Sequence, residues 1–162
     1  MQKTRIQLPA MQFVGLTVRT NNQAEKNPET AKISPTIQKY FQQGISDKLQ
    51  HRSNPGVLYC VYTNYESDVT GDYTYFVGEM VNALDGVAAG CETLVIPEQQ
   101  YVKFTNGPDT MPEVCIKAWQ NIWGMSRENL GGDRAYIADF EIYDERSYDP
   151  KNAVLDIYIG IR

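Results

Sequence analysis

The sequence predicts an α+β fold in which one β-α-β-β unit occurs twice, with antiparallel sheets and two main helices packed on one face. The first observation behind this prediction is order, because strand-like and helix-like segments follow in the same succession in both halves. The second is local similarity: Tyr75-Phe76-Val77-Gly78 aligns with Ile157-Tyr158-Ile159-Gly160, and Tyr62-Thr63-Asn64-Tyr65-Glu66 with Phe140-Glu141-Ile142-Tyr143-Asp144. We therefore expect repeats at about residues 11–81 and 94–161 within one domain, residues 1–162.

The first repeat begins with residues 11–20, whose β-branched and aromatic side chains predict a strand, and a polar loop follows. Ser34 and Pro35 are typical of a helix start, and an apolar stripe then recurs at helical spacing. This stripe predicts a helix over about residues 34–52 and consists of Ile37, Tyr40, Phe41, Ile45 and Leu49. Residues 57–65 and 72–81 read as two paired strands that complete the unit.

The second repeat shows the same order. Residues 94–104 predict a strand broken by Pro97, and Asn106-Gly107-Pro108 predicts a turn. Thr110 and Glu113 form a capping-box pattern that opens a second helix, which Gly124 ends. Residues 134–144 and 154–161 are predicted to be the closing strands.

Alternation of side chains assigns faces to these last two strands. Leu155, Ile157 and Ile159 are expected under the helices, so Tyr158 points to the other side. In the neighbouring strand the row of Tyr136, Ala138, Phe140 and Ile142 is more apolar, which leaves Glu141 on the opposite row. On this interpretation Glu141 and Tyr158 share a face.

Composition excludes several classes of function. The chain has 162 residues with 15 Lys and Arg against 20 Asp and Glu, a net charge of −5, so no general positive field is available for direct nucleic-acid binding. No apolar run approaches the roughly 18 residues of a membrane span, and the first residues lack the apolar segment of a secretory signal. We therefore expect a cytoplasmic protein.

Cysteine and histidine usage argues against a metal site and against most enzymes. Cys60, Cys91 and Cys115 show no C-x-x-C spacing, and His51 is the only histidine. This predicts reduced cysteines and neither a zinc site nor a cofactor. Neither a G-x-S-x-G nor a P-loop pattern occurs, so we expect a non-enzyme, with weak hydrolysis of a small molecule as the alternative left open.

The chain resembles the gyrase-inhibitory-protein-like family, the effector-binding domain found behind AraC-type and MerR-type DNA-binding domains and also alone. The doubled β-α-β-β order carries the resemblance over about residues 8–162. So do short motifs: Ile96-Pro97, Tyr101-Val102-Lys103-Phe104, Gly107, Trp119, Ile122-Trp123, Phe140-Glu141-Ile142-Tyr143 and Asp156-Ile157-Tyr158-Ile159. The chain is most similar to freestanding members, including integron-cassette proteins that bind cationic drugs, and we expect no DNA-binding domain.

The resemblance implies a cleft between the repeats, in which aromatic rings and one buried glutamate hold a lipophilic cation. It implies that this glutamate is Glu141 and places Tyr158 and Trp123 beside it. Repeat symmetry and neighbouring positions add four further candidates for ligand contact: Tyr59, Phe76, Tyr143 and Trp119. For each of these aromatic residues, simple core or rim packing is the alternative, and for Glu141 it is a solvent-facing strand position.

Two functions therefore remain open. The first is non-enzymatic binding of hydrophobic cations, for sequestration or for signalling to a separate transcription regulator. The second is a protein-interaction module of the gyrase-inhibitor type, acting on a DNA enzyme or a regulator. The expected partners are accordingly lipophilic cations and such a protein, with neither nucleic acid nor membrane, and the exposed sheet edges leave a homodimer open.

Overall fold

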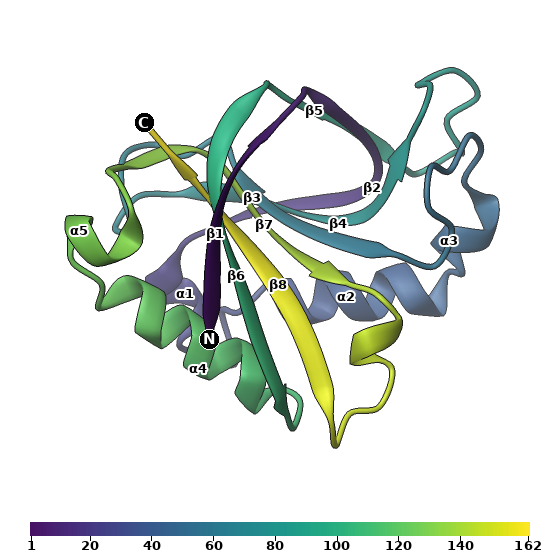
Figure 1. Cartoon of the computed structure of the whole chain (residues 1–162). Coiled ribbons are helices and arrows are strands. Elements are labelled where there is room, and N and C mark those ends of the chain that lie inside the picture. Colours follow the sequence, from purple (N-terminus) through teal and green to yellow (C-terminus); the bar gives the residue numbers. More distant parts are fainter.

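The computed structural model describes all residues, 1–162, as one curved eight-stranded sheet with helices along one side (Figure 1). Both main helices, α2 and α4, lie along the lower side of the sheet in this view. The strands are β1 (Gln2–Leu8), β2 (Met11–Thr20), β3 (Leu58–Thr63), β4 (Tyr73–Val81), β5 (Glu92–Ile96), β6 (Gln99–Asp109), β7 (Arg134–Tyr143) and β8 (Ala153–Ile161). The helices are α1 (Asn22–Glu25), α2 (Ile33–Gln42), α3 (Ile45–Lys48), α4 (Glu113–Trp123) and α5 (Arg127–Leu130), with a 3-10 turn at Glu145–Ser147. None of the helices is both long and apolar enough to cross a lipid bilayer.

The two predicted repeats are the two halves of this sheet. The strand order is β1-β6-β8-β7-β3-β4-β2-β5, and every pairing is antiparallel. β2-α2-β3-β4 and β6-α4-β7-β8 are therefore the β-α-β-β units, joined where β3 pairs with β7. The strand that precedes each unit crosses to the other one, because β1 pairs with β6 and β5 pairs with β2. These exchanged edge strands tie the halves together.

The element boundaries differ from the sequence prediction at several places, among them the start of α4, where Pro112 and not Thr110 is the N-cap residue. The helix expected at 34–52 is divided into α2 and α3 by Gly44, whose positive φ of 59° interrupts the helical backbone. β6 continues through the turn expected at Asn106-Gly107-Pro108, with an irregular pairing there. The sequence did not reveal β1, which is an edge strand whose side chains are mostly exposed and polar.

Three apolar clusters fill the two sides of the sheet. One lies between the second-half strands and α4, and includes Ala118, Ile122 and Leu155. Another lies between the first-half strands and α2 and α3, and includes Tyr40 and Ile45. The third, here called the far-face cluster, lies on the side away from the helices; its buried members are Met11, Phe13, Tyr59, Val61, Phe76, Ile96, Tyr101, Ala138, Phe140 and Tyr158. Both faces of the central strands are thus buried.

One strand contact requires glycine on both sides. A Cβ built on Gly15 of β2 comes within 2.1 Å of the Val77 carbonyl oxygen, and one on Gly78 of β4 within 2.3 Å of the Val14 carbonyl oxygen. Gly15 and Gly78 are direct partners in the β2–β4 ladder. Their missing side chains allow the two backbones to approach closely.

The face predicted for Glu141 is wrong. Glu141 is paired with Cys60 of β3 and with Ile157 of β8, and both partners point toward the helices. Phe140 instead pairs with Tyr158 on the far face, where their rings stack with centroids 4.5 Å apart. Because both faces of β7 are buried, the more apolar row does not identify the helix side, and the assignment slipped by one residue.

Candidate functional site

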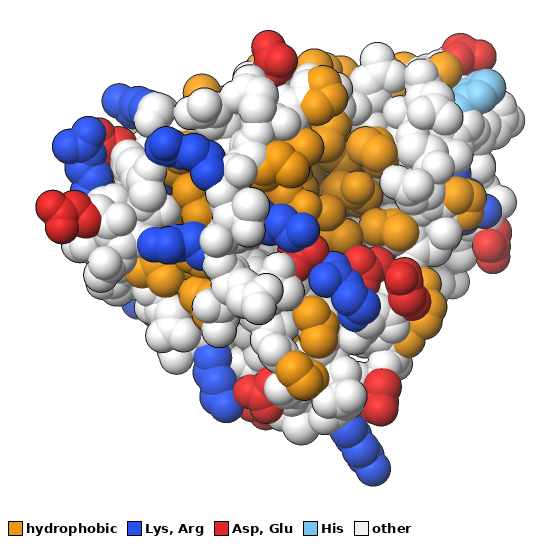
Figure 2. Space-filling view, in the orientation of Figure 1, with side chains coloured by type: hydrophobic (Ala, Val, Ile, Leu, Met, Phe, Trp, Pro, Cys, Tyr) orange, Lys and Arg blue, Asp and Glu red, His pale blue; other side chains and the backbone are white.

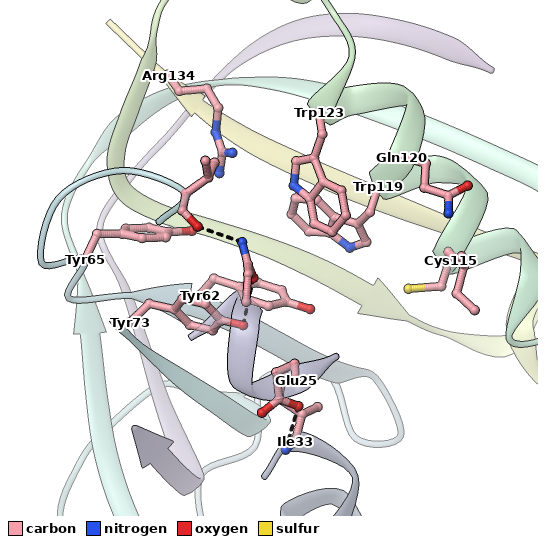
Figure 3. A pocket seen from close by; sticks show the side chains of 13 residues that line it. Glu25, Ile33, Tyr62, Tyr65, Tyr73, Cys115, Trp119, Gln120, Trp123 and Arg134 are labelled. Atoms are coloured by element: carbon pink, nitrogen blue, oxygen red, sulfur yellow. Dashed lines mark hydrogen bonds between the residues drawn. The ribbon is translucent and has the colours of Figure 1, made fainter. Parts of the chain in front are cut away.

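A cavity of about 230 Å³ lies between the two halves of the chain, on the helix side of the sheet (Figure 3). Its wall comes from α1, from the start of α2, from β3, β4 and the turn that joins them, from α4 and from the start of β7. We call this cavity the aromatic pocket; it is lined by Asn22, Glu25, Ile33, Tyr62, Tyr65, Val69, Tyr73, Cys115, Ile116, Trp119, Gln120, Trp123 and Arg134. The predicted location of a cleft between the repeats is confirmed.

The rings of the pocket are positioned by regular secondary structure. Trp119 and Trp123 are four residues apart on α4, so both project from one face of the helix, and their ring centroids are 6.0 Å apart. The ring of Tyr62 in β3 meets Trp119 edge-on, with centroids 5.2 Å apart, and is tilted against Tyr73 of β4, with centroids 5.6 Å apart. Figure 3 shows the two indole rings above Tyr62 across the cavity. The pocket therefore presents aromatic surface from both halves, which suits planar and cationic groups.

Glu141 lies directly behind this aromatic wall and is only 3% exposed. Its Oε2 accepts hydrogen bonds from the Trp119 indole Nε1 at 2.6 Å and from the Tyr62 hydroxyl at 2.9 Å. Its Oε1 accepts one from the Tyr143 hydroxyl at 2.7 Å. These donors compensate for the water that the carboxylate loses on burial. The result is a negative charge one side-chain layer away from the cavity.

The hydroxyl groups around Glu141 are held in their protonated, hydrogen-bond-donating form. Burial is the largest cause that raises the pKa of both Tyr62 and Tyr143 well above the usual tyrosine value, and the negative charge of Glu141 is the next. Burial likewise raises the pKa of the Cys115 thiol, whose Sγ lies 3.6 Å from Glu141 Oε2. The only formal charge within this cluster is therefore that of the carboxylate.

Alkaline pH is expected to unfold the protein because it ionises buried tyrosine side chains. The folded-state pKa of Tyr62, Tyr65, Tyr75 and Tyr143 is raised, mainly by burial, above the unfolded value of about 10. Their contribution to stability is present in full below that value and is lost as the pH rises toward the folded-state pKa. Urea unfolding at several pH values, with tyrosinate absorbance, checks this. Loss of stability above pH about 10, with tyrosinate appearing as the chain unfolds, is expected; smooth ionisation of all tyrosines in a folded protein would contradict it.

A second buried carboxylate supports the other end of the pocket. Asp139 is fully buried and accepts hydrogen bonds from the Tyr65 hydroxyl, from Arg134 Nη2 at 2.6 Å and from the Gly160 backbone N–H at 2.7 Å. Arg134 in turn stacks over the Tyr136 ring at 4.6 Å. Burial is the largest single cause and lowers the pKa of Arg134, but Asp139, Tyr65 and Tyr136 together outweigh it, so the net direction of the pKa is upward. The arginine is thus a fixed cation in the pocket wall.

The structure brings together only part of the predicted site. Glu141, Tyr143 and Trp119 form one hydrogen-bonded cluster behind the pocket, and Trp123, 54% exposed, stands at its rim. Tyr158, Tyr59 and Phe76 belong instead to the far-face cluster on the opposite side of the sheet. Figure 2 shows hydrophobic side chains gathered in a hollow over the middle strands, on the side away from α2 and α4.

Several pocket residues were missed by the sequence analysis. Tyr62 and Tyr73 lie in strands that were predicted correctly, but repeat symmetry predicted Tyr59 and Phe76 as the ligand-contacting residues of these strands. Alternation could have found Tyr62 once the helix side of β3 was known, because it is three positions from Tyr59 and faces the other way. Asn22 and Glu25 are the two ends of α1, within a segment that the sequence predicted only as a polar loop, and Arg134 is the first residue of β7.

The cysteines and acids form no metal site. No group of three or more His, Cys, Asp or Glu side chains is arranged to hold a metal ion, and all three cysteines are free. The chemistry that the site offers is therefore that of a buried charge, aromatic faces and a guanidinium group.

Comparison with known proteins places the chain among effector-binding proteins. The family model described as integron-associated effector binding protein, Cass2, matches residues 6–161. A curated relative, the putative transcriptional regulator protein YobU of Bacillus subtilis, is 28% identical over 155 residues, which cover 96% of this chain and 94% of that protein. The crystal structure of an integron cassette protein from Vibrio cholerae aligns with a TM-score of 0.75 at 27% identity, over 99% of this chain and 95% of that one.

A further solved structure shares the fold. It is SAV2435 bound to tetraphenylphosphonium, which aligns with a TM-score of 0.77 over all of this chain and 94% of that one. Its sequence identity to this chain is 17%.

Proposed function

The chain belongs to the Cass2 family of integron-associated effector-binding proteins, and on that premise we propose that it binds hydrophobic organic cations in the aromatic pocket. The observation that carries the proposal is the buried carboxylate of Glu141, covered by Trp119 and Tyr62 at the wall of an apolar cavity. In that position its charge is screened less than it would be in water, so it attracts a cation that enters the pocket.

The aromatic wall favours a delocalised or alkylated cation over a strongly hydrated one. Ring faces of Tyr62, Trp119 and Trp123 offer cation–π contacts of roughly 0.5 to 2 kcal/mol each. A hydrophobic cation also loses little hydration energy on entering a cavity whose lining is mostly apolar. The tetraphenylphosphonium seen with SAV2435 is a compound of this class, which supports the proposal by analogy of fold.

The donors that surround Glu141 give the pocket two ways to respond to a cation. With the hydrogen bonds intact, the ligand stays one side-chain layer away from the carboxylate. With Trp119 displaced, its indole N–H leaves Glu141 and the ligand contacts the acid directly. Trp119 is buried at 9% exposure, so displacement would change its fluorescence. The emission of Trp119 therefore reports which of these modes occurs.

Titration with matched ligands tests the proposal. The purified protein is titrated with tetraphenylphosphonium and, separately, with neutral tetraphenylmethane-type isosteres of the same shape, while tryptophan emission and isothermal heat are followed. Saturable micromolar binding of the cation, and at least about tenfold weaker binding of the isostere, is expected. Equal binding of both compounds would show that burial of apolar surface alone drives binding, and would overturn the role of the charge.

We further propose that binding occurs without turnover, in the cytoplasm, and that the bound state is sequestered or reported to a separate regulator. The pocket presents no nucleophile poised for reaction, because burial raises the pKa of the Cys115 thiol far from the thiolate form. Recovery of unchanged ligand after prolonged incubation is expected. A hydrolysed product that accumulates with protein concentration would contradict the non-enzymatic reading.

A further inference from the structure

The aromatic pocket does not end at its rim but opens into a wider groove. The groove has a volume of about 1410 Å³, and six residues line both spaces: Asn22, Glu25, Val69, Gln120, Trp123 and Arg134. The pocket alone, at about 230 Å³, is smaller than the roughly 300 to 1,000 Å³ of ordinary ligand sites. A drug-sized ligand whose cationic part fills the pocket must therefore extend past Trp123 into the groove.

The groove has the opposite charge character to Glu141. Its lining contains four basic side chains, Lys26, Arg127, Arg134 and Arg162, against two acidic ones, Glu25 and Asp133. This excess of positive charge occurs in a protein whose net charge is −5. Arg127 is paired with Asp133 at 3.0 Å, whereas Lys26 and Arg162 are exposed and form no ion pair. The Glu25 carboxylate accepts hydrogen bonds from neutral donors only, namely Thr20 Oγ1 and the backbone N–H groups of Lys32 and Ile33, so it still counts as one of the two acidic groups of the groove.

Arg134 stands where the pocket and the groove meet. Its side chain is 12% exposed, its Nη2 donates to Asp139, and its Nη1 forms no hydrogen bond. The Tyr136 ring covers one face of the guanidinium and fixes its plane. Figure 3 shows Arg134 at the Tyr65 end of the pocket, with Cys115, the neighbour of Glu141, at the other. The cavity thus has a negative end and an end with unused cationic donors.

We propose that the groove beside Arg134 is a subsite for an anionic group, and that the preferred ligands are zwitterions: a hydrophobic cation that carries a carboxylate, sulfonate or phosphate on a short tether. This inference rests on the proposed function. The cationic part occupies the aromatic pocket in front of Glu141, and the anionic group accepts hydrogen bonds from Arg134 Nη1 and lies near Lys26 and Arg162. Charge-assisted hydrogen bonds to a partly desolvated arginine are the strong kind.

A set of three matched dyes tests the inference on the unmodified protein. The dyes are styrylpyridinium cations whose ring nitrogen carries a propyl, a sulfopropyl or a trimethylammoniopropyl chain, which makes a monocation, a zwitterion and a dication of the same shape. We expect the zwitterion to bind about fivefold or more tightly than the monocation, and the dication to bind most weakly. Equal affinity of monocation and zwitterion, or preference for the dication, would overturn the anionic subsite and leave cation binding standing. Failure of all three dyes to bind would overturn the proposed function itself.

Variants locate the effect. The double variant Lys26→Gln with Arg162→Gln, both at exposed positions, is expected to lower the ratio of zwitterion affinity to monocation affinity toward one. Arg134→Lys is expected to lower this affinity ratio while a cation remains beside Asp139. Lys39→Gln with Lys151→Gln removes the same charge from exposed positions outside the groove and serves as the matched control. The anionic subsite lies elsewhere if the control variant at Lys39 and Lys151 lowers the affinity ratio as much as the groove variant at Lys26 and Arg162 does.

Discussion

Replacing Glu141 by Gln is expected to lower the affinity for a hydrophobic cation by at least about tenfold, equivalent to about 1.4 kcal/mol. The substitution removes the buried negative charge behind the aromatic wall but keeps the shape of the side chain. Its carbonyl oxygen still accepts one of the hydrogen bonds from Trp119, Tyr62 or Tyr143. Dissociation constants for tetraphenylphosphonium, measured by tryptophan emission for the variant and the parent protein, check the prediction.

The matched control for this variant is Glu145→Gln, because Glu145 is an exposed acid outside the pocket and the change in net charge is the same. Affinity for the neutral isostere is expected to be nearly the same in all three proteins, since it does not sense the charge. A variant at Glu141 that keeps full affinity for the cation while remaining folded would show that the aromatic rings, and not the carboxylate, select the ligand.

Replacing Asp139 by Ala is expected to have the largest effect on stability, a loss of about 3–5 kcal/mol in the free energy of unfolding. Asp139 is fully buried, and its removal leaves the Arg134 guanidinium without a counter-ion in a largely desolvated position. The Gly160 N–H and the Tyr65 hydroxyl lose their acceptor at the same time. Urea denaturation followed by far-UV circular dichroism measures the difference.

An exposed ion pair provides the control for that measurement. Asp133 is 57% exposed and pairs with Arg127 at 3.0 Å, so water and salt already screen the pair. Asp133→Ala is expected to change the free energy of unfolding by no more than about 1 kcal/mol. A similar small loss for Asp139→Ala would mean that the buried network contributes little. If Asp139→Ala does not fold, Asp139→Asn, whose single carbonyl oxygen keeps an acceptor for either the Gly160 N–H or the Tyr65 hydroxyl, is expected to recover part of the stability.

Much of the fold could be predicted because the relevant signals are local. The strand at 11–20 follows from its β-branched and aromatic residues, and the order of elements repeats in both halves. The predicted boundaries of helices and strands were less accurate where the backbone conformation of a residue depends on its tertiary contacts. Gly44 divides the first helix, and β1 is held in place by its pairing with β6 rather than by a hydrophobic pattern of its own.

The candidate site could be predicted only in part. Glu141 was identified through a resemblance and Trp119 through its position four residues before Trp123, and the two side chains are hydrogen-bonded to each other. Tyr158 was assigned to the face of Glu141 because alternation relates residues within one strand but does not say which row faces the helices. The observed pairing of Phe140 with Tyr158 shows that the row of Phe140 faces away from the helices. Only the register with a neighbouring strand could reveal this.

The sequence by itself determined the repeated β-α-β-β order, the acidic charge and the wealth of aromatic residues, because these depend on the identity and spacing of neighbours along the chain. The tertiary structure alone decided which side chains from the two halves meet to form the pocket. Tyr62 and Tyr73 come from the first half, and Trp119 and Arg134 from the second. Contacts over such separations depend on strand register, where a shift of one residue moves a side chain to the other face of the sheet.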